Sequence, residues 1–422
     1  MHVGLFGNLA NNAYILGKLL RKEFDVKLTL FPYETFALGH PLWEDCSLVL
    51  DWDFLMSGKT TRAFWDEKAR ELNWRMPDWV KQIDINTLTR EQVLSKCVRS
   101  PALAINAIIN GGKSQTEIKL ALKNLHIIES FSESDFVTIF GEGVIFARLS
   151  RVPFIAIPYG ADLTISAFRT GLPGEMQRAA YAKASRILVA DPDFIDCLDK
   201  LGLSDRWTYW PCPIDTERYA PTSASVDDDR VLQSLPPSCS DKFIFFMPCR
   251  HDFHWKGTDK AVRAFLRLCR VRDDAILITP SWGNDTATVR RIVRENRAEK
   301  SVVFLPYVLS KPRLIEFYRF SDVVLDQFVL GSYGTTTLEA MACEKPVIAH
   351  IESNKYRPHL GQLPPNLQAN LEQEIFEKMR WALENPELLP DVGKRSREWV
   401  ISEHHEKPIR LLEDIVRGQL SH

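Results

Sequence analysis

The sequence lacks the marks of a membrane-spanning, secreted or nucleic-acid-binding protein. It has no run of about eighteen apolar residues, the length that a helix needs to cross a bilayer. The N-terminal Met-His-Val-Gly-Leu-Phe-Gly has no charged segment ahead of a long apolar stretch, unlike a signal peptide. The net charge of −2 argues against nucleic acid as a partner, because binding its phosphates requires a positive excess. We therefore expect a cytoplasmic protein, or one that contacts the inner face of a membrane peripherally.

Three kinds of chemical site are missing or incomplete. The eight cysteines form no Cys-x-x-Cys pair and no cluster, which favours a reducing compartment. His251 and His254 flank an acidic residue, but no convincing third ligand accompanies them, so we expect no metal ion. Gly4 and Gly7 precede a helical pattern without the third glycine of a dinucleotide fingerprint.

What the chain does contain is a regular alternation of short apolar runs and amphipathic helical patterns. This alternation predicts βα units and parallel sheets, the α/β class, and 422 residues exceed what one hydrophobic core usually holds. The strands expected in the first half are Val3–Phe6, Val26–Phe31, Leu48–Leu50, Phe136–Phe140, Phe154–Ile157, Ile187–Ala190 and Trp207–Trp210. Those expected in the second half are Phe243–Met247, Ala275–Thr279, Val302–Leu305, Val323–Asp326 and Val347–His350.

A polar stretch rich in proline, serine and aspartate interrupts the alternation and predicts the domain boundary. We expect a first Rossmann-like domain over residues 1–221, a linker over 222–240 and a second Rossmann-like domain over 241–394. The final helices, in 395–422, are expected to pack back on the first domain.

The stretch from Gly331 to Pro346 is a glycine-rich turn that leads into a helix. Glycines at 331 and 334 allow the backbone to approach a ligand closely, and a helix N-terminus favours an anion such as phosphate. Glu339, one turn into the helix, is placed to accept hydrogen bonds from sugar hydroxyls. Thr336 and Glu339 also fit a capping box that needs no ligand. The candidate ligand-binding residues are Gly331, Ser332, Tyr333, Gly334, Thr335, Thr336 and Glu339.

Further strings extend this pattern through most of the chain. They are Ala190-Asp-Pro-Asp-Phe-Ile-Asp196, Pro213-Ile-Asp-Thr-Glu-Arg-Tyr-Ala-Pro221, Arg250 with Lys256-Gly257, Val303-Phe-Leu-Pro-Tyr307, and Leu338-Glu-Ala-Met-Ala-Cys343 with Lys345-Pro-Val-Ile348. In this order they resemble the motifs of the retaining glycosyltransferases of family four. The resemblance implies the GT-B fold, in which two Rossmann-like, doubly wound domains face a central cleft.

The resemblance also implies an activity. The donor is a nucleotide-diphosphate sugar, with a UDP-sugar expected first and GDP- or ADP-sugars as alternatives, and no cofactor is required. Arg250 and Lys256 resemble the family's basic pair on the donor diphosphate, and a solvated basic loop is the alternative. A guanidinium after a strand can bind phosphate oxygens bidentately, while a lysine adds a point charge. The acceptor is the hydroxyl of a glycan, a lipid-linked molecule or a small molecule.

The second domain departs from the family pattern at two positions, Gly331 and Glu344. Gly331 stands where the family commonly has a glutamate, so the sugar contacts of that carboxylate are not carried over. Asp326 and Gln327 either supply donor contacts instead or only make hydrogen bonds at the strand end. Glu344 replaces the glycine that usually ends the helix, so the helix end is expected to differ.

The first domain departs as well, since Tyr159 replaces the usual active-site histidine. Tyr159 either hydrogen-bonds the donor sugar or packs at a strand end, and Asp162 either binds a hydroxyl or caps the next helix. The strand-end loops expected to face the cleft or the acceptor contain Gly7, Asn8, Asn11, Asn12 and Glu142.

Two surface features have open alternatives. Lys18, Arg21 and Lys22 on the first helix either attract an anionic membrane or form a solvated face. Five of the eleven tryptophans lie in or beside residues 55–125 and either contact a sugar or lipid or fill the core.

Two other functions fit the same architecture. A nucleotide-sugar epimerase would convert the donor without any acceptor. A catalytically silent nucleotide- or sugar-binding scaffold would explain Gly331 and Tyr159, although it has no need of Arg250, Lys256 and Glu339 together.

Overall fold

The computed structural model describes residues 1–30, 39–83, 88–110, 115–150, 152–222 and 226–420. The chain forms two compact units. The first unit comprises residues 1–42, 60–211 and 408–422, and the second comprises residues 43–59 and 212–407. We describe each unit by itself.

The first unit is built on a parallel sheet in the order β4-β2-β1-β5-β6-β7-β8. Its strands are β1 (His2–Phe6), β2 (Asp25–Leu30), β4 (Val80–Gln82), β5 (Phe136–Phe140), β6 (Phe154–Ile157), β7 (Arg186–Val189) and β8 (Trp207–Tyr209). Every residue of β5 and β6 is buried, as the continuous apolar runs of a parallel sheet covered on both faces predict.

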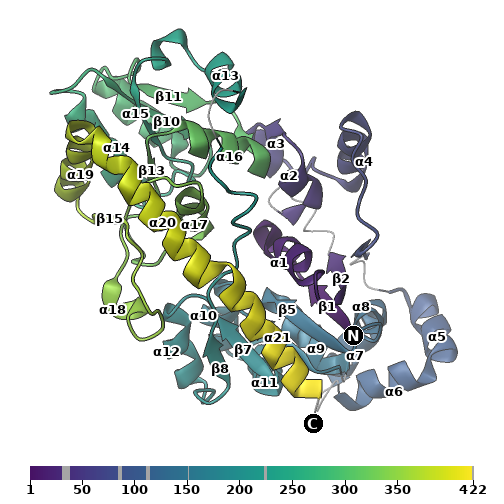
Figure 1. Cartoon of the computed structure of the whole chain (residues 1–422). Helices are drawn as coiled ribbons and strands as arrows, with labels where there is room; N and C mark the ends of the chain where they lie inside the picture. The colour runs from purple at the N-terminus through teal and green to yellow at the C-terminus, as the bar shows by residue number, and fades with distance from the viewer. Residues whose placement is uncertain (31–38, 84–87, 111–114, 151, 223–225, 421–422) are drawn as a thin grey trace. The chain divides into compact units, whose positions relative to one another are not determined.

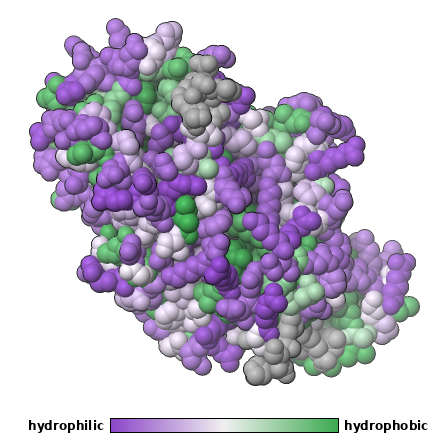
Figure 2. Space-filling view, in the orientation of Figure 1, coloured by the Kyte–Doolittle hydropathy of each residue, from purple (hydrophilic) through white to green (hydrophobic). Residues whose placement is uncertain are grey.

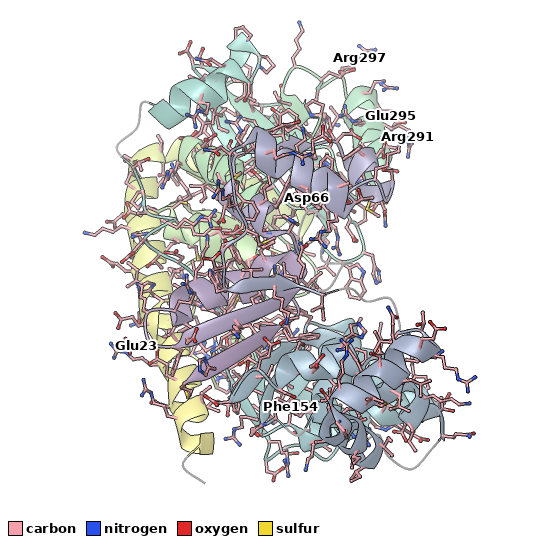
Figure 3. All side chains as sticks on the ribbon, turned by 90° about the vertical axis from the view of Figure 1, so that its right-hand side faces the viewer. Glu23, Asp66, Phe154, Arg291, Glu295 and Arg297 are labelled. Atoms are coloured by element: carbon pink, nitrogen blue, oxygen red, sulfur yellow. The ribbon has the colours of Figure 1, made fainter. Side chains whose placement is uncertain are left out.

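Helices cover both faces of this sheet. The helices of this unit include α1 (Asn12–Leu20), α4 (Arg62–Glu71), α5 (Arg90–Arg99), α6 (Pro101–Asn110), α7 (Gln115–Lys123), α8 (Leu125–Phe131), α9 (Val144–Ser150), α10 (Ala161–Thr164), α11 (Leu172–Lys183), α12 (Asp193–Lys200) and α21 (Glu406–Leu420). On one face, Leu16 of α1 and Leu412 of α21 share a core with β1 and β2. Glu23, just after α1, lies beside α21 (Figure 3). Burial of Glu413 in α21, together with the negative charge of Glu23, raises the pKa of Glu413.

The second unit has a parallel sheet in the order β11-β10-β9-β13-β14-β15. Its strands are β9 (Phe243–Phe246), β10 (Ala275–Pro280), β11 (Val302–Leu305), β13 (Val323–Leu325), β14 (Val347–Ala349) and β15 (Leu367–Gln368). The register pairs Phe243 with Ala275 on one side of β9 and Phe245 with Val323 on the other. The strand order therefore reverses at β9, which makes the β9–β13 border the topological switch point.

The helices of the second unit are mostly crossover connections. They include α13 (Val226–Gln233), α14 (Thr258–Leu268), α15 (Thr286–Glu295), α16 (Lys311–Phe320), α17 (Thr335–Ala342), α18 (Ser353–Tyr356), α19 (Glu372–Glu384) and α20 (Leu389–His404). Figure 1 shows α14 beside α19, and both pack on the core around Phe245 and Leu277. On the solvent side of α15, Arg291 and Glu295 (Figure 3) form an ion pair of 3.1 Å.

The units divide the chain differently from the expected domains in three places. Val49–Leu50 (β3), expected in the first sheet, pairs with Val308–Leu309 (β12) of the second unit. The stretch expected to be a linker contains α13, which packs on α16 within the second unit. Of the closing helices, α20 belongs to the second unit and most of α21 to the first. A short apolar run does not specify which strand it pairs with, and a polar stretch does not specify which helix it packs on. Local sequence patterns were therefore insufficient to assign these segments to a unit.

One face of the surface can be followed in Figure 2. Hydrophilic residues cover most of the face in Figure 2, with hydrophobic residues scattered among them. No helix among the described residues combines the length and hydrophobicity that crossing a bilayer requires.

Candidate functional site

The loops that follow β9 and β13 meet at the switch point of the second sheet. The backbone N–H of Phe328 donates to the carbonyl of Lys256 at 2.8 Å. Gly257 has φ +65°, and a Cβ there would lie 2.8 Å from Cγ2 of Val329. A glycine is therefore required where the two loops touch. Ligands of open α/β sheets bind at this edge, beyond the carboxyl ends of the strands.

The side chain of Lys256 lies at this junction and contacts two polar side chains. Its ammonium lies 3.0 Å from Oε1 of Gln327 and 3.6 Å from Oδ1 of the fully buried Asp326. The other carboxylate oxygen of Asp326 accepts a 2.7 Å hydrogen bond from Thr337 of α17. Asp326 and Gln327 thus make strand-end contacts that hold Lys256, the second of their two expected roles. One carboxylate connects the lysine to the helix that follows the glycine turn.

Two helices begin at the same junction, and no side chain caps their N-terminal N–H groups in the described structure. Gly257 precedes α14 and Gly334 precedes α17, and neither helix start receives a side-chain capping bond in the described structure. The alternative capping box of Thr336 and Glu339 is wrong, because Thr336 lies inside α17 and Glu339 binds elsewhere. Free N–H groups and the helix dipole at these ends favour an anion.

Arg250 lies on the loop between β9 and α14, which Asp252 organises. Nε of Arg250 is 3.1 Å from Oδ2 of Asp252, while Oδ1 accepts from the backbone N–H of Trp255 at 2.8 Å. The N–H of Asp252 in turn donates to Oγ1 of Thr258. The sequence analysis did not identify Asp252 as part of the site, although an aspartate three residues before a backbone donor is a common turn signal.

His251 lies in the core of the loop and has no metal-like surroundings. It is fully buried, and Nε2 is 3.5 Å from Oγ1 of Thr279. Burial, assisted by Arg290, lowers the pKa of His251 to about 4. Among the residues that the structure describes, no group of three histidine, cysteine or acidic side chains is arranged to hold a metal ion.

Glu339 is held by two side chains that the sequence analysis missed. Its carboxylate is only 2% exposed, pairs with the ammonium of Lys311, and accepts a hydrogen bond of 3.1 Å from the hydroxyl of Tyr318. Burial, and then the charge of Glu339, raises the pKa of Tyr318 well above its usual range. Both partners come from α16. No local pattern indicates them, since the contact depends on how α16 packs beside α17.

Both close packing and a backbone hydrogen bond shape the glycine turn. Gly331 has φ +69°, and a Cβ there would lie 2.5 Å from Oε1 of Glu352. The backbone N–H of Glu352 also donates to the carbonyl of Gly331. A side chain at position 331 would have to displace the carboxylate of Glu352 and would be strained at this positive φ, so a glycine suits the position. Ser332 is buried beside it, whereas Thr335 and Thr336 open α17 with partly exposed side chains.

Tyr333 faces the protein rather than an open site. Its ring stacks on Tyr356 with centroids 4.5 Å apart, and its hydroxyl is 3.3 Å from Nε2 of His404. Nδ1 of His404 lies 2.9 Å from the carbonyl of Cys212, and burial lowers the pKa of His404 to about 4. Neutral His404 therefore donates to Cys212 and accepts from Tyr333, which fixes the turn to α20.

In the first unit, the strand-end loops of β1, β5 and β6 lie close together. Gly7 has φ +87°, and a Cβ there would be 2.6 Å from the carbonyl oxygen of Phe140. The ring of Tyr159 stacks on Phe140 at 5.4 Å, and Gly141 approaches Tyr159 closely enough that a Cβ would lie 3.2 Å from its ring. Tyr159 thus packs at the strand end, one of its two expected positions.

The side chains of two asparagines after β1 are buried and bind backbone carbonyl groups. Asn8 and Asn11 are buried, and their amides donate to the carbonyls of Gly39 and His40 at 2.8 and 3.2 Å. Asn12 begins α1. The side chain of Glu142, the other expected cleft residue, lies outside the described residues.

Asp162 shapes the turn that contains Tyr159. It accepts hydrogen bonds from the N–H groups of Tyr159 and Gly160, at 2.9 and 2.8 Å, and from the hydroxyl of Tyr181. Burial raises the pKa of Asp162, although these three donors oppose the shift. Its role as a local cap fits this geometry.

The basic residues of α1 lie over aromatic rings. The ammonium of Lys18 is 4.6 Å from the ring centre of Tyr14, and the guanidinium of Arg21 is 5.3 Å from that of Trp79. Trp43 and Trp65 are almost fully buried, which agrees with a core role for these tryptophans.

Comparison with known proteins converges on the same part of the chain. Residues 236–399, which include Arg250, Lys256 and Glu339, match the family model described as Glycosyl transferases group 1. This finding supports a glycosyltransferase. Alpha-monoglucosyldiacylglycerol synthase of Acholeplasma laidlawii is 19% identical over 225 residues. Those residues are 53% of this chain and 56% of the synthase, so the chain spans little more than half of that relative.

Two solved structures resemble the whole chain. Anabaena HepE in complex with UDP and glucose is 12% identical, covers 100% of both chains and has a TM-score of 0.65. Sucrose-phosphate synthase from Thermosynechococcus elongatus is 16% identical, covers 100% of this chain and 99% of its own, and has a TM-score of 0.60. These similarities confirm the expected fold class, α/β with two Rossmann-like domains of the GT-B type.

Proposed function

We propose that this chain is a retaining glycosyltransferase that moves a sugar from a UDP-sugar to an acceptor hydroxyl. The observation that supports this most is the ammonium of Lys256 at the switch point, between two helix N-termini without side-chain caps. The family match covers the same segment. HepE was solved with UDP and with UDP-glucose, which favours uridine over guanosine or adenosine in the donor.

In the proposed reaction, the acceptor oxygen attacks the anomeric carbon from the face on which the diphosphate leaves. The bond between that carbon and the phosphate oxygen breaks, and the acceptor proton passes to a diphosphate oxygen. Lys256, Arg250 and the starts of α14 and α17 stabilise the negative charge that develops on the leaving group. Glu339 accepts hydrogen bonds from the ribose. Because the protein itself supplies the positive field, the proposed chemistry requires no cofactor.

We propose that the acceptor binds to the first unit. The loops that contain Gly7, Gly141 and Tyr159 gather at the carboxyl edge of its sheet, the position at which open α/β sheets bind ligands. A carbohydrate or lipid-linked hydroxyl suits this proposal. Peripheral contact with an anionic membrane also stays a prediction. The exposed apolar residues Leu94 and Val98 on α5 and Ile105 and Ile109 on α6 suit such a contact better than α1 does.

A cytoplasmic location is part of the proposal. All eight cysteines are free thiols in the structure, as a reducing compartment requires.

The test is a screen of UDP-, GDP- and ADP-sugars with measurement of nucleoside diphosphate release and of the sugar anomer formed. Arg250→Ala is the informative variant, because the side chain is 45% exposed and its removal leaves the core intact. We expect about a 100-fold fall in turnover at an unchanged melting temperature. Arg297→Ala, on an exposed turn outside the site, is the matched control and should keep full activity.

Three results would contradict the proposal. Conversion of the donor sugar to its epimer without release of diphosphate would indicate an epimerase. Binding of a nucleotide sugar without turnover of any acceptor or water would indicate a scaffold. A fall in activity in Arg250→Ala that accompanies a clear fall in melting temperature would assign that residue a structural role.

A further inference from the structure

A short segment from the N-terminal half of the chain is built into the second unit. Residues 43–59 follow β2 of the first unit in sequence but belong to the second. β3 (Val49–Leu50) pairs antiparallel with β12 (Val308–Leu309). Next to this pair, Leu48 and Ser310 exchange two hydrogen bonds, one to the serine hydroxyl at 2.8 Å and one between backbones at 2.9 Å. We call residues 43–59 the excursion.

Side chains anchor the excursion at its beginning and end. Glu44 is completely buried and pairs with Arg218 of the second unit. The proximity of Glu44 offsets burial and raises the pKa of Arg218. Further along, Trp52 of α3 (Trp52–Met56) contacts Trp282 edge to face, with ring centres 5.7 Å apart and planes at 71°. The indole N–H of Trp282 donates to the carbonyl of Pro248 at 2.9 Å.

Both contacts of the excursion adjoin the proposed donor site. Ser310, which binds Leu48, immediately precedes Lys311, and Lys311 pairs with Glu339. Trp282 follows β10 and its carbonyl accepts from the N–H of His251, next to Arg250. The excursion therefore touches the segments that follow β10 and β11.

The order of phosphate, ribose and base in a nucleoside diphosphate indicates which group of the ligand would lie near the excursion. If the phosphates lie at Lys256 and the ribose at Glu339, the base extends past Lys311 toward β12 and the strand ends of β10 and β11. That region contains Trp52 and Trp282, both half-buried, so each ring keeps an accessible surface. Every base has an aromatic face that stacks on an indole, and such contacts contribute substantially to binding.

We propose that the excursion forms a wall of the nucleoside-base site, and that Trp52 and Trp282 provide the aromatic surface on which the base packs. This inference rests on the proposed function. It makes the excursion a contributor to the affinity for a nucleoside diphosphate, although the excursion comes from the half of the sequence that precedes the family match.

The test compares ligands with and without the base. In the full chain, Trp52→Ala should weaken the binding of UDP about tenfold and should also weaken the binding of ADP and GDP, because every base can stack on an indole. The affinity of the variant for inorganic pyrophosphate, measured by competition, should stay within twofold of that of the wild type, because the phosphate contacts are unchanged. Trp52→Phe keeps an aromatic ring and should retain most of the affinity. Met56→Ala, on the exposed end of the same helix, is the matched control and should bind UDP normally.

Two results would overturn the inference. Unchanged affinity for UDP, ADP and GDP in Trp52→Ala would limit the tryptophan pair to holding the excursion in place. Equal losses of UDP and pyrophosphate binding in both Trp52→Ala and Trp52→Phe would show a general structural effect. Absence of any UDP binding by the wild-type chain would instead refute the proposed function on which the inference rests.

Discussion

Lys311 and Glu339 form a buried ion pair at the centre of the second unit, with 17% and 2% of their side chains exposed. Such a pair is costly to assemble in a core, and removing one partner leaves an unpaired buried charge. Tyr318 supplies a further hydrogen bond to the carboxylate, yet it cannot neutralise the charge. Lys311 is therefore a positioning residue that orients the carboxylate of Glu339.

We predict that Lys311→Met lowers the free energy of unfolding of the second unit by about 3 kcal/mol, because the buried carboxylate of Glu339 loses its ion-pair partner. The double variant Lys311→Met/Glu339→Gln should recover at least half of that loss. Urea unfolding at pH 7 measures both. A single variant as stable as the wild type, or a double variant less stable than the single one, would contradict the prediction.

Glu344 shows how a residue departs from the family pattern without changing the geometry. We expected a different helix end in place of the usual glycine, and this expectation is wrong. Glu344 adopts the left-handed conformation with φ +60°, and the N–H of Lys345 donates to the carbonyl of Ala340 at 3.0 Å. The fold thus accepts about 1 kcal/mol of backbone strain at this position.

At the scale of elements, that helix end is fixed by the crossing of α20 over α17. Gly393 of α20 lies directly on the carbonyl of Glu344, and a Cβ there would be 1.9 Å from its oxygen. Arg397, one turn further along α20, donates to the carbonyl of Ala342. The close approach of these two helices requires a residue without a side chain.

We predict that Gly393→Ala destabilises the second unit by about 2 kcal/mol or more, because the helices must separate to admit the methyl group. Gly418→Ala in α21 is the matched control, since nothing lies within 4 Å of its added Cβ. Removing a glycine from a helix in open space should be neutral or stabilising by up to about 1 kcal/mol. Thermal unfolding of the two variants distinguishes them, and equal effects would refute the close-packing argument.

At the scale of the whole molecule, three of the buried histidines contribute most to the response to acid. Burial lowers the pKa of His40 to about 3, and those of His251 and His404 to about 4. In the unfolded chain each histidine takes up a proton near pH 6.5. Between pH 6.5 and 4 the unfolded state thus binds more protons than the folded state, so stability falls as the pH falls through this window.

We predict that the second unit, with two of these histidines, loses stability as the pH falls from 7.5 to 5.5, up to about 1.4 kcal/mol per histidine for each pH unit below 6.5. His404→Gln retains a donor for Cys212 and an acceptor for Tyr333 and should make this slope shallower. Urea unfolding at pH 7.5, 6.5 and 5.5 tests it. Identical slopes in the variant and the wild type would show that His404 does not contribute.

Much of the fold was predictable from the sequence. The strands Phe136–Phe140, Phe154–Ile157 and Val302–Leu305 have the expected bounds, because continuous apolar runs between turns identify buried parallel strands locally. The approach of Lys256-Gly257 to the loop after β13 was not predicted, and neither was the partner of Leu48–Leu50. A short apolar run identifies a strand but not the strand beside it.

The sequence by itself determined the α/β class, the two sheets and the glycine turn that opens α17, since periodicity and glycine placement act within a few residues. Only the tertiary structure decided that Lys311 neutralises Glu339, that Asp326 holds Lys256, and that the excursion belongs to the second unit. These contacts join residues from 28 to 262 positions apart. Their partners are selected by burial and packing of whole elements, which no local pattern encodes.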